Sequence, residues 1–199
     1  MKIGLYGGTF SPPHNGHVRF AKLFVEKAAL DKLYIMPAGI PPHKEADSWG
    51  TPQARLEMSR LAFGSFAVVS DYEICQPGKS YTYKTLLQLR RIYPKDALYV
   101  LVGEDMFLSL DTWKCPEILF SAATIVCMHR GTDMREHVEA AGTAYKRRYG
   151  GNIIYLEEAP LAVSSTQIRQ MCAAGQDISA LVPAPVAAYI KQNGLYRYE

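Results

Sequence analysis

The sequence has few cysteines and no long apolar run. Its four cysteines, Cys75, Cys115, Cys127 and Cys172, are scattered and form no CxxC pair. This scatter argues against a disulfide framework and favours reduced thiols in a cytoplasmic protein. No apolar stretch is long enough to cross a bilayer, and the N-terminus passes directly into a predicted strand. We therefore expect neither a membrane segment nor a secretory signal.

Neither sign of charge dominates the chain. The 22 Lys and Arg residues against 19 Asp and Glu give a net charge of +3 over 199 residues. This charge is too small to indicate a nucleic-acid partner, although it suits small anionic substrates. Repeats, low-complexity tracts and linkers are also lacking, so we expect one domain over residues 1–199, with a small helical part at about 163–199. The oligomeric state stays open, a homo-oligomer included.

The chain begins with a strand, a glycine turn and a helix. Residues 3–6 are apolar, as in a short buried strand, Gly7 and Gly8 break it, and apolar residues take helical spacing from His17 onward. This order lets backbone N–H groups and a helix N-terminus reach a phosphate. Either His14 or His17 alone would be typical of a helix cap, but both stand at the helix start and can face one anion. No Cys, Asp or Glu nearby completes a zinc-ligand set.

Strands and helices alternate along the rest of the chain. Strands are predicted at 33–36, 66–70, 97–103, 123–128 and 152–155, and helices after Thr51, after residue 83, and at 134–149 and 186–192. Strand–helix–strand units form right-handed parallel crossovers. We therefore predict an α/β protein with a Rossmann-like, doubly wound parallel sheet. The run 97–103 is apolar throughout and is expected to be central.

A second anion-binding signal lies near the C-terminus, at residues 163–169. Ser164 with Gln167 fits a capping box, which predicts a helix start. The hydroxyl residues Ser164, Ser165 and Thr166 are followed on the next turn by Arg169. Hydroxyls, backbone N–H groups and a guanidinium that face one place form a phosphate clamp.

Loop residues at the predicted strand ends allow two interpretations each. Lys44 is either a phosphate contact or a solvated lysine. Ser80 or Thr82 caps a helix whose N-terminus can also bind a carboxylate. Asp105 either meets a ribose hydroxyl beyond the central strand or caps a short helix. Trp113 either pins its loop to the core or stacks on a flat ring.

These motifs together resemble those of the nucleotidylyltransferase superfamily. Residues 7–17 resemble its GGTFDPxHxGH signature, with Ser11 in place of the usual Asp, and residues 163–169 resemble its (I/V)SSTxIR motif. The intervening loops resemble those of bacterial nicotinate-nucleotide adenylyltransferases, through Ile-Pro-Pro-His-Lys at 40–44, Ser-Tyr-Thr at 80–82 and Thr-Trp at 112–113.

The resemblance implies an enzyme that transfers the adenylyl group of ATP to nicotinate mononucleotide, with Mg²⁺ carried in by ATP and no metal ligand in the protein. The products would be nicotinate adenine dinucleotide and pyrophosphate, in NAD biosynthesis. The implied catalytic residues are His14, His17, Lys44 and Arg169. Those implied for ATP and its phosphates are Gly7, Gly8, Thr9, Phe10, Gly103, Ser164, Ser165 and Thr166. Those implied for the nicotinate nucleotide are Ser80, Tyr81, Thr82, Asp105 and Trp113.

The chain departs from the family pattern at two further places. Ala38 stands where relatives often have Asn, and His129-Arg130 where they usually read Arg-Pro, so these residues are left outside the predicted core site. Three alternatives remain open: nicotinamide mononucleotide as acceptor, another acceptor such as phosphopantetheine, or a nucleotide sensor without turnover. The segment 80–82 and Trp113 argue against phosphopantetheine, and the intact histidines argue against a sensor.

Overall fold

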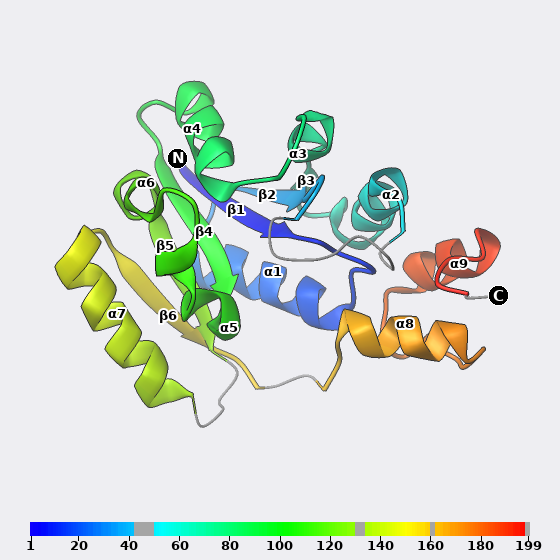
Figure 1. Cartoon of the computed structure of the whole chain (residues 1–199). Helices are drawn as coiled ribbons and strands as arrows, with labels where there is room; N and C mark the ends of the chain where they lie inside the picture. Colours follow the sequence, from blue (N-terminus) through cyan, green and yellow to red (C-terminus); the bar gives the residue numbers. More distant parts are fainter. Residues whose placement is uncertain (42–49, 130–133, 160–161, 198–199) are drawn as a thin grey trace. The chain divides into compact units, whose positions relative to one another are not determined.

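The computed structural model of the chain describes residues 1–41, 50–129, 134–159 and 162–197. Within them six strands form one parallel sheet in the order β3-β2-β1-β4-β5-β6 (Figure 1). The predicted α/β class with a doubly wound parallel sheet is confirmed. The strands are β1 (Lys2–Gly8), β2 (Lys32–Pro37), β3 (Val68–Val69), β4 (Ala97–Gly103), β5 (Thr124–His129) and β6 (Ile153–Glu157).

Helices fill most of the segments between the strands and the C-terminal segment. They are α1 (Asn15–Ala28), α2 (Pro52–Phe63), α3 (Tyr72–Cys75), α4 (Thr82–Ile92), α5 (Glu104–Phe107), α6 (Pro116–Ala122), α7 (Arg135–Tyr149), α8 (Ser165–Ala173) and α9 (Ala184–Gln192), with a 3₁₀ turn at Leu110–Thr112. Among the helices that the structure describes, none is long and apolar enough to cross a membrane.

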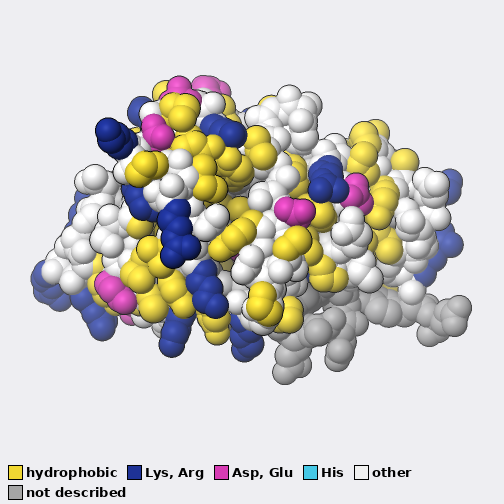
Figure 2. Space-filling model, turned by 90° about the horizontal axis from the view of Figure 1, so that it is seen from above, with side chains coloured by type: hydrophobic (Ala, Val, Ile, Leu, Met, Phe, Trp, Pro, Cys, Tyr) yellow, Lys and Arg dark blue, Asp and Glu magenta, His cyan; other side chains and the backbone are white. Residues whose placement is uncertain are grey.

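The chain divides into two compact units. Unit 1 comprises Met1–Gly7, Leu23–Leu33 and Tyr81–Pro160, and unit 2 comprises Gly8–Lys22, Tyr34–Ser80 and Leu161–Glu199. The expectation of a single domain stays a prediction. Lys and Arg side chains stand at several separate places on the face shown in Figure 2, with apolar side chains between them.

The core of unit 1 is built on β4 and β5. These strands pair in parallel from Tyr99 opposite Thr124 to Gly103 opposite Met128. The residues of β5 from 125 to 128 have no exposed surface, as expected for a parallel strand that is covered on both faces. Aromatic rings close one side of this core, where Phe120 stacks on Tyr149 with centroids 5.1 Å apart. The predicted central position of 97–103 is confirmed, because β4 lies between β1 and β5.

Local capping chemistry explains where helix α2 of unit 2 begins. Thr51 accepts a hydrogen bond from the Ala54 amide through its hydroxyl, and Pro52 takes the first helical position. The strand predicted after this helix at 66–70 is shorter than expected. The amides of Phe66 and Ala67 both donate to the Phe63 carbonyl, so they extend the helix end and leave only Val68–Val69 for β3.

The four cysteines are free, and they differ in burial: Cys75 is exposed, Cys115 is half-buried, and Cys127 and Cys172 are buried. Burial, with the nearby Glu104 carboxylate, raises the pKa of the Cys127 thiol to about 12, whereas Cys75 is exposed. Because the thiolate is the reactive form, roughly one Cys127 in 10⁴ is reactive near pH 8. We expect a thiol reagent to label Cys75 in the native protein within minutes and Cys127 only after unfolding. Peptide mapping after alkylation checks this, and equal labelling of the two cysteines would contradict it.

Candidate active site

The start of helix α1 is capped by the two histidines of the first motif. The Nδ1 atom of His14 accepts from the His17 amide at 3.3 Å, and the Nδ1 atom of His17 accepts from the His14 amide at 3.2 Å. This is a capping box in which imidazoles replace the usual hydroxyl and carboxylate. The two interpretations of these histidines, helix cap and ligand contact, are therefore compatible.

The capping bonds also decide which ring nitrogen carries the proton. Because each Nδ1 accepts a hydrogen bond, the hydrogen-bond network assigns the proton of each neutral ring to Nε2. The two rings stack with centroids 3.7 Å apart, and His14 is 7% exposed. The pair lies at the start of α1, the end where the helix dipole favours an anion.

Two glycines allow the close packing around these rings. A side chain at Gly16 would place its Cβ 3.1 Å from the His14 ring, and one at Gly8 would place it 2.9 Å from the Phe10 ring. Phe10 is buried, takes a left-handed φ of 48°, and contacts the His17 ring edge-on at 5.2 Å. Thr9, between Gly8 and Phe10 in the chain, is partly exposed, and Gly7 is exposed near the end of β1.

The late motif contacts the early one directly. Ser164 caps α8 by accepting from the Gln167 amide, as predicted. The Ser165 hydroxyl donates to the Pro12 carbonyl at 2.9 Å, and Nη1 of Arg169 donates to the Ser11 carbonyl at 2.9 Å. Nη2 of Arg169 donates to the Thr166 hydroxyl at 3.3 Å. The Arg169 guanidinium is therefore bound to Ser11, which lies three residues before His14 in the chain.

The C-terminal segment adds a buried tyrosine to this loop. The hydroxyls of Ser11 and Tyr196 lie 3.2 Å apart, and both residues are buried. Burial raises the pKa of the Tyr196 hydroxyl to about 12, so this group is neutral at physiological pH. Ser11, which stands where the family usually has Asp, thus carries a structural contact. The segment before α9 is tied in as well, since the Asn15 amide donates to the Leu181 carbonyl at 2.9 Å.

Ser80 is bound to the loop that follows β2. Its hydroxyl accepts from the Gly39 amide at 2.9 Å, and its amide donates to the Ile40 carbonyl at 2.8 Å. The prediction that Ser80 or Thr82 caps α4 is wrong. Tyr81 occupies the cap position of that helix without a side-chain bond, because the Ser80 hydroxyl is used elsewhere.

The remaining predicted residues belong to unit 1. Gly103 is the N-cap residue of α5, which contradicts the alternative that Asp105 caps this helix, and Asp105 is exposed in its first turn. Trp113 is half-buried directly after the 3₁₀ turn, and its amide donates to Leu110. Tyr81 and Thr82 are half-buried at the start of α4. Lys44 lies outside the described residues.

Two residues that the sequence analysis left out of the site are partners. Nδ1 of His129 lies 2.8 Å from Oε2 of Glu104, and both side chains are at least nine-tenths buried. The two atoms are within ion-pair distance, although the ring N–H is not aligned with the carboxylate as a hydrogen bond requires. The pair joins the end of β5 to the first residue after β4. No sequence signal connects these positions, which lie in separate strand–helix units.

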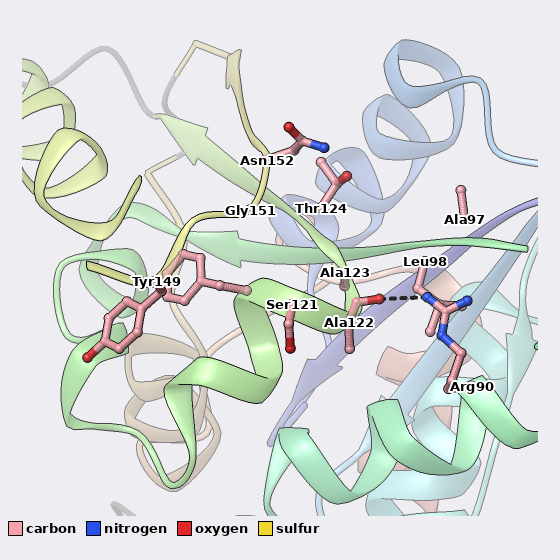
Figure 3. A pocket seen from close by; sticks show the side chains of 11 residues that line it. Arg90, Ala97, Leu98, Ser121, Ala122, Ala123, Thr124, Tyr149, Gly151 and Asn152 are labelled. Atoms are coloured by element: carbon pink, nitrogen blue, oxygen red, sulfur yellow. Dashed lines mark hydrogen bonds between the residues drawn. The ribbon is translucent and has the colours of Figure 1, made fainter. Parts of the chain in front are cut away.

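A cavity of about 400 Å³ lies at the amino ends of strands β4 and β5 in unit 1 (Figure 3). Its walls include the first residues of β4 and β5, and Arg90 beside it donates to the Ala122 carbonyl at 2.8 Å. Ligands of open parallel sheets bind beyond the carboxyl ends of the strands. This cavity at the amino ends is therefore not the predicted site.

A metal ion has no ready-made ligand set in the part of the chain that the structure describes. No group of three or more His, Cys, Asp or Glu side chains there is placed to hold one. A cation that arrives with a triphosphate keeps phosphate oxygens and water as ligands and does not need such a cage. Nucleotidyltransferases generally use a divalent metal ion with ATP.

The parallel sheet contains a strand–glycine turn–helix unit, and the hydroxyl-rich start of α8 is bound to the turn of that unit. These features define an α/β nucleotide-binding protein. The model of the cytidylyltransferase-like family matches residues 5–171. The chain belongs to this family and, within it, to the group of the nicotinate-nucleotide adenylyltransferases.

Relatives match the chain over its whole length. A protein of Geobacter metallireducens named "Probable nicotinate-nucleotide adenylyltransferase" is 38% identical, with 100% of both chains covered. A protein of the same name from Pseudomonas syringae pv. tomato is 38% identical, with 98% of this chain and 94% of the relative covered.

A solved structure shares the fold. Nicotinic acid mononucleotide adenylyltransferase of Plasmodium falciparum, in complex with NaAD, superimposes with a TM-score of 0.79 at 18% identity and covers 98% of this chain and 97% of its own.

Proposed function

We propose that the protein transfers the adenylyl group of ATP to nicotinate mononucleotide, forming nicotinate adenine dinucleotide and pyrophosphate in NAD biosynthesis. The observation that carries the proposal is the contact between the two motifs. Arg169 and Ser165 of the late motif bind the carbonyls of Ser11 and Pro12, directly before the paired histidines. The names of the full-length relatives support the choice of substrates.

The proposed reaction is a direct displacement. A phosphate oxygen of nicotinate mononucleotide attacks the α-phosphorus of ATP, and the bond from that phosphorus to the bridging oxygen breaks, so that pyrophosphate leaves with the electron pair. The nucleophile is already ionised at neutral pH, so the protein mainly aligns the groups and stabilises the growing negative charge. No covalent intermediate is needed, since no Ser or Cys nucleophile beside an oriented base is among the predicted residues.

The histidines and the late motif take the phosphate roles in this proposal. The Nε2–H groups of His14 and His17 donate to phosphate oxygens, and Arg169 uses guanidinium hydrogens beyond those engaged with Ser11 and Thr166. Mg²⁺ bound to ATP supplies further charge neutralisation. Lys44 adds a cation in the same proposal. The set proposed for ATP and its phosphates is Gly7, Gly8, Thr9, Phe10, Gly103, Ser164, Ser165 and Thr166.

For the nicotinate nucleotide we propose contacts from five residues. Ser80, Tyr81 and Thr82 receive the nicotinate carboxylate, Trp113 stacks on the pyridine ring, and Asp105 meets a ribose hydroxyl. The N-terminus of α4, which has no side-chain cap, supports the carboxylate role, because a helix start favours an anion. The partly exposed ring of Trp113 supports stacking.

Acceptor preference tests the proposed function. We expect kcat/KM for pyrophosphate release to be at least tenfold higher with nicotinate than with nicotinamide mononucleotide, because unpaired donors penalise an acceptor that lacks the carboxylate. Mass spectrometry of the product provides the second measurement. Equal or reversed preference would assign a different acceptor, and ATP binding without any turnover would identify a sensor.

A further inference from the structure

Arg55 on helix α2 is a buried cation to which the sequence analysis assigned no role. It is 1% exposed. Its Nη1 donates to the Thr9 carbonyl at 3.0 Å and to the Ala38 carbonyl at 2.6 Å, and its Nη2 donates to the Gly39 carbonyl at 2.9 Å. A single guanidinium therefore joins the loop after β1 to the loop after β2, and all of these groups belong to unit 2.

These bonds fix the direction of the peptide groups in both loops. A trans peptide group is planar, so its N–H points opposite to its carbonyl oxygen. With the Thr9 carbonyl held by Arg55, the Phe10 amide is turned away from the guanidinium. The Gly39 amide, opposite the bound Ala38 carbonyl, donates to Ser80. Three oxygens that would repel a phosphate are thus turned toward a cation.

Within the part of the chain that the structure describes, no carboxylate forms an ion pair with Arg55. Burial lowers the pKa of the guanidinium, but an arginine stays protonated in a protein. Tyr196, the neighbour that favours its charge, is a neutral phenol at physiological pH. The Nε atom of Arg55 also has no hydrogen-bond partner among the described residues. Such a charge is costly to bury unless an anion approaches it.

We propose that Arg55 is a positioning residue of the anion site, which aligns the loops after β1 and β2 and supplies positive charge that an incoming polyphosphate balances. The inference rests on the proposed function for the identity of the nucleotide, but polyphosphate binding itself does not depend on it. A lysine cannot replace this residue, because only the planar fork of arginine reaches three carbonyls at once.

The test compares Arg55→Lys, which keeps the charge, with Arg55→Met, which removes it. Arg60→Met is the matched control, because Arg60 is an exposed cation on the same helix. Inorganic tripolyphosphate is the probe, and its Kd is measured by calorimetry about 20 °C below the unfolding midpoint of each variant. We expect the Kd to rise at least tenfold in both Arg55 variants and to stay within twofold in the control. The kcat for adenylyl transfer should fall at least tenfold in the same two variants.

A folded Arg55→Lys or Arg55→Met protein with Kd and kcat within twofold of the wild type would overturn the proposal. Reduced thermal stability with an unchanged Kd would do the same, since a purely structural role predicts that result. If the wild type binds tripolyphosphate but does not turn over, the proposed function fails, and the Kd comparison still decides the role of Arg55.

A second measurement uses the unmodified protein and applies if neither variant folds. In protein labelled with ¹⁵N-arginine, the Nε–H signal of Arg55 is expected to move when tripolyphosphate is added, while that of Arg60 stays in place. An unmoved Arg55 signal at saturating tripolyphosphate would contradict the proposal.

Discussion

Replacing His14 by asparagine is expected to leave the protein folded and to lower its rate of adenylyl transfer by about 10²–10³-fold, the typical loss when one preorganised donor is removed. Asparagine is a favourable helix cap, so its side-chain oxygen can still accept from the His17 amide. It has no group that reaches the position of Nε2. The variant thus separates the two roles that the structure gives to the imidazole.

The experiment combines single-turnover rates with calorimetry of a non-hydrolysable ATP analogue. We expect His14→Asn to lose rate while its affinity for the analogue changes less than tenfold. His14→Ala should lose the same rate and, in addition, about 1 kcal/mol of stability with the cap. His137→Asn is the matched control, because this histidine is exposed on α7. A rate for His14→Asn within threefold of the wild type would remove His14 from the proposed mechanism.

Caps and turns could be predicted from the sequence because their chemistry is local. Thr51 and Ser164 each accept a hydrogen bond from an amide three residues further along, and the sequence predicted a helix start at both positions. The strand–glycine turn–helix unit likewise depends on neighbours in the chain. In each case the bond forms within one helical turn, so the residue order alone contains the information.

Contacts between distant segments could not be predicted in this way. The Ser80 hydroxyl accepts from Gly39, 41 residues earlier, which is why it does not cap α4. Arg55 stands in a helix whose apolar spacing is visible, but no local pattern shows that a charged residue there is buried. The contact between Arg169 and Ser11 spans 158 residues and was not predicted, since the motif resemblance implied only that Arg169 and the two histidines serve one site.

The pair of Glu104 and His129 gives the largest expected effect on stability. Both side chains are buried at the carboxyl ends of β4 and β5. Replacing His129 by leucine removes the imidazole that lies 2.8 Å from the buried Glu104 carboxyl group, and loss of one partner of a buried pair typically destabilises a protein by about 3–5 kcal/mol. Replacing both residues, as Glu104→Met with His129→Leu, is expected to destabilise less than His129→Leu alone, because neither buried partner is then left without the other.

A double-mutant cycle in urea measures this coupling as the free energy of unfolding of the four proteins. Arg135→Leu, which breaks the exposed contacts of Arg135 with Glu139 and Glu157, serves as the control and should change stability little. Additive single effects would contradict the pairing.

The buried pair also lies next to two predicted site residues, since Glu104 stands directly between Gly103 and Asp105. In a variant that keeps its fold but loses this buried pair, we expect the affinity for nicotinate mononucleotide to fall more than the affinity for ATP. The reason is that Asp105 is the residue proposed to meet the ribose.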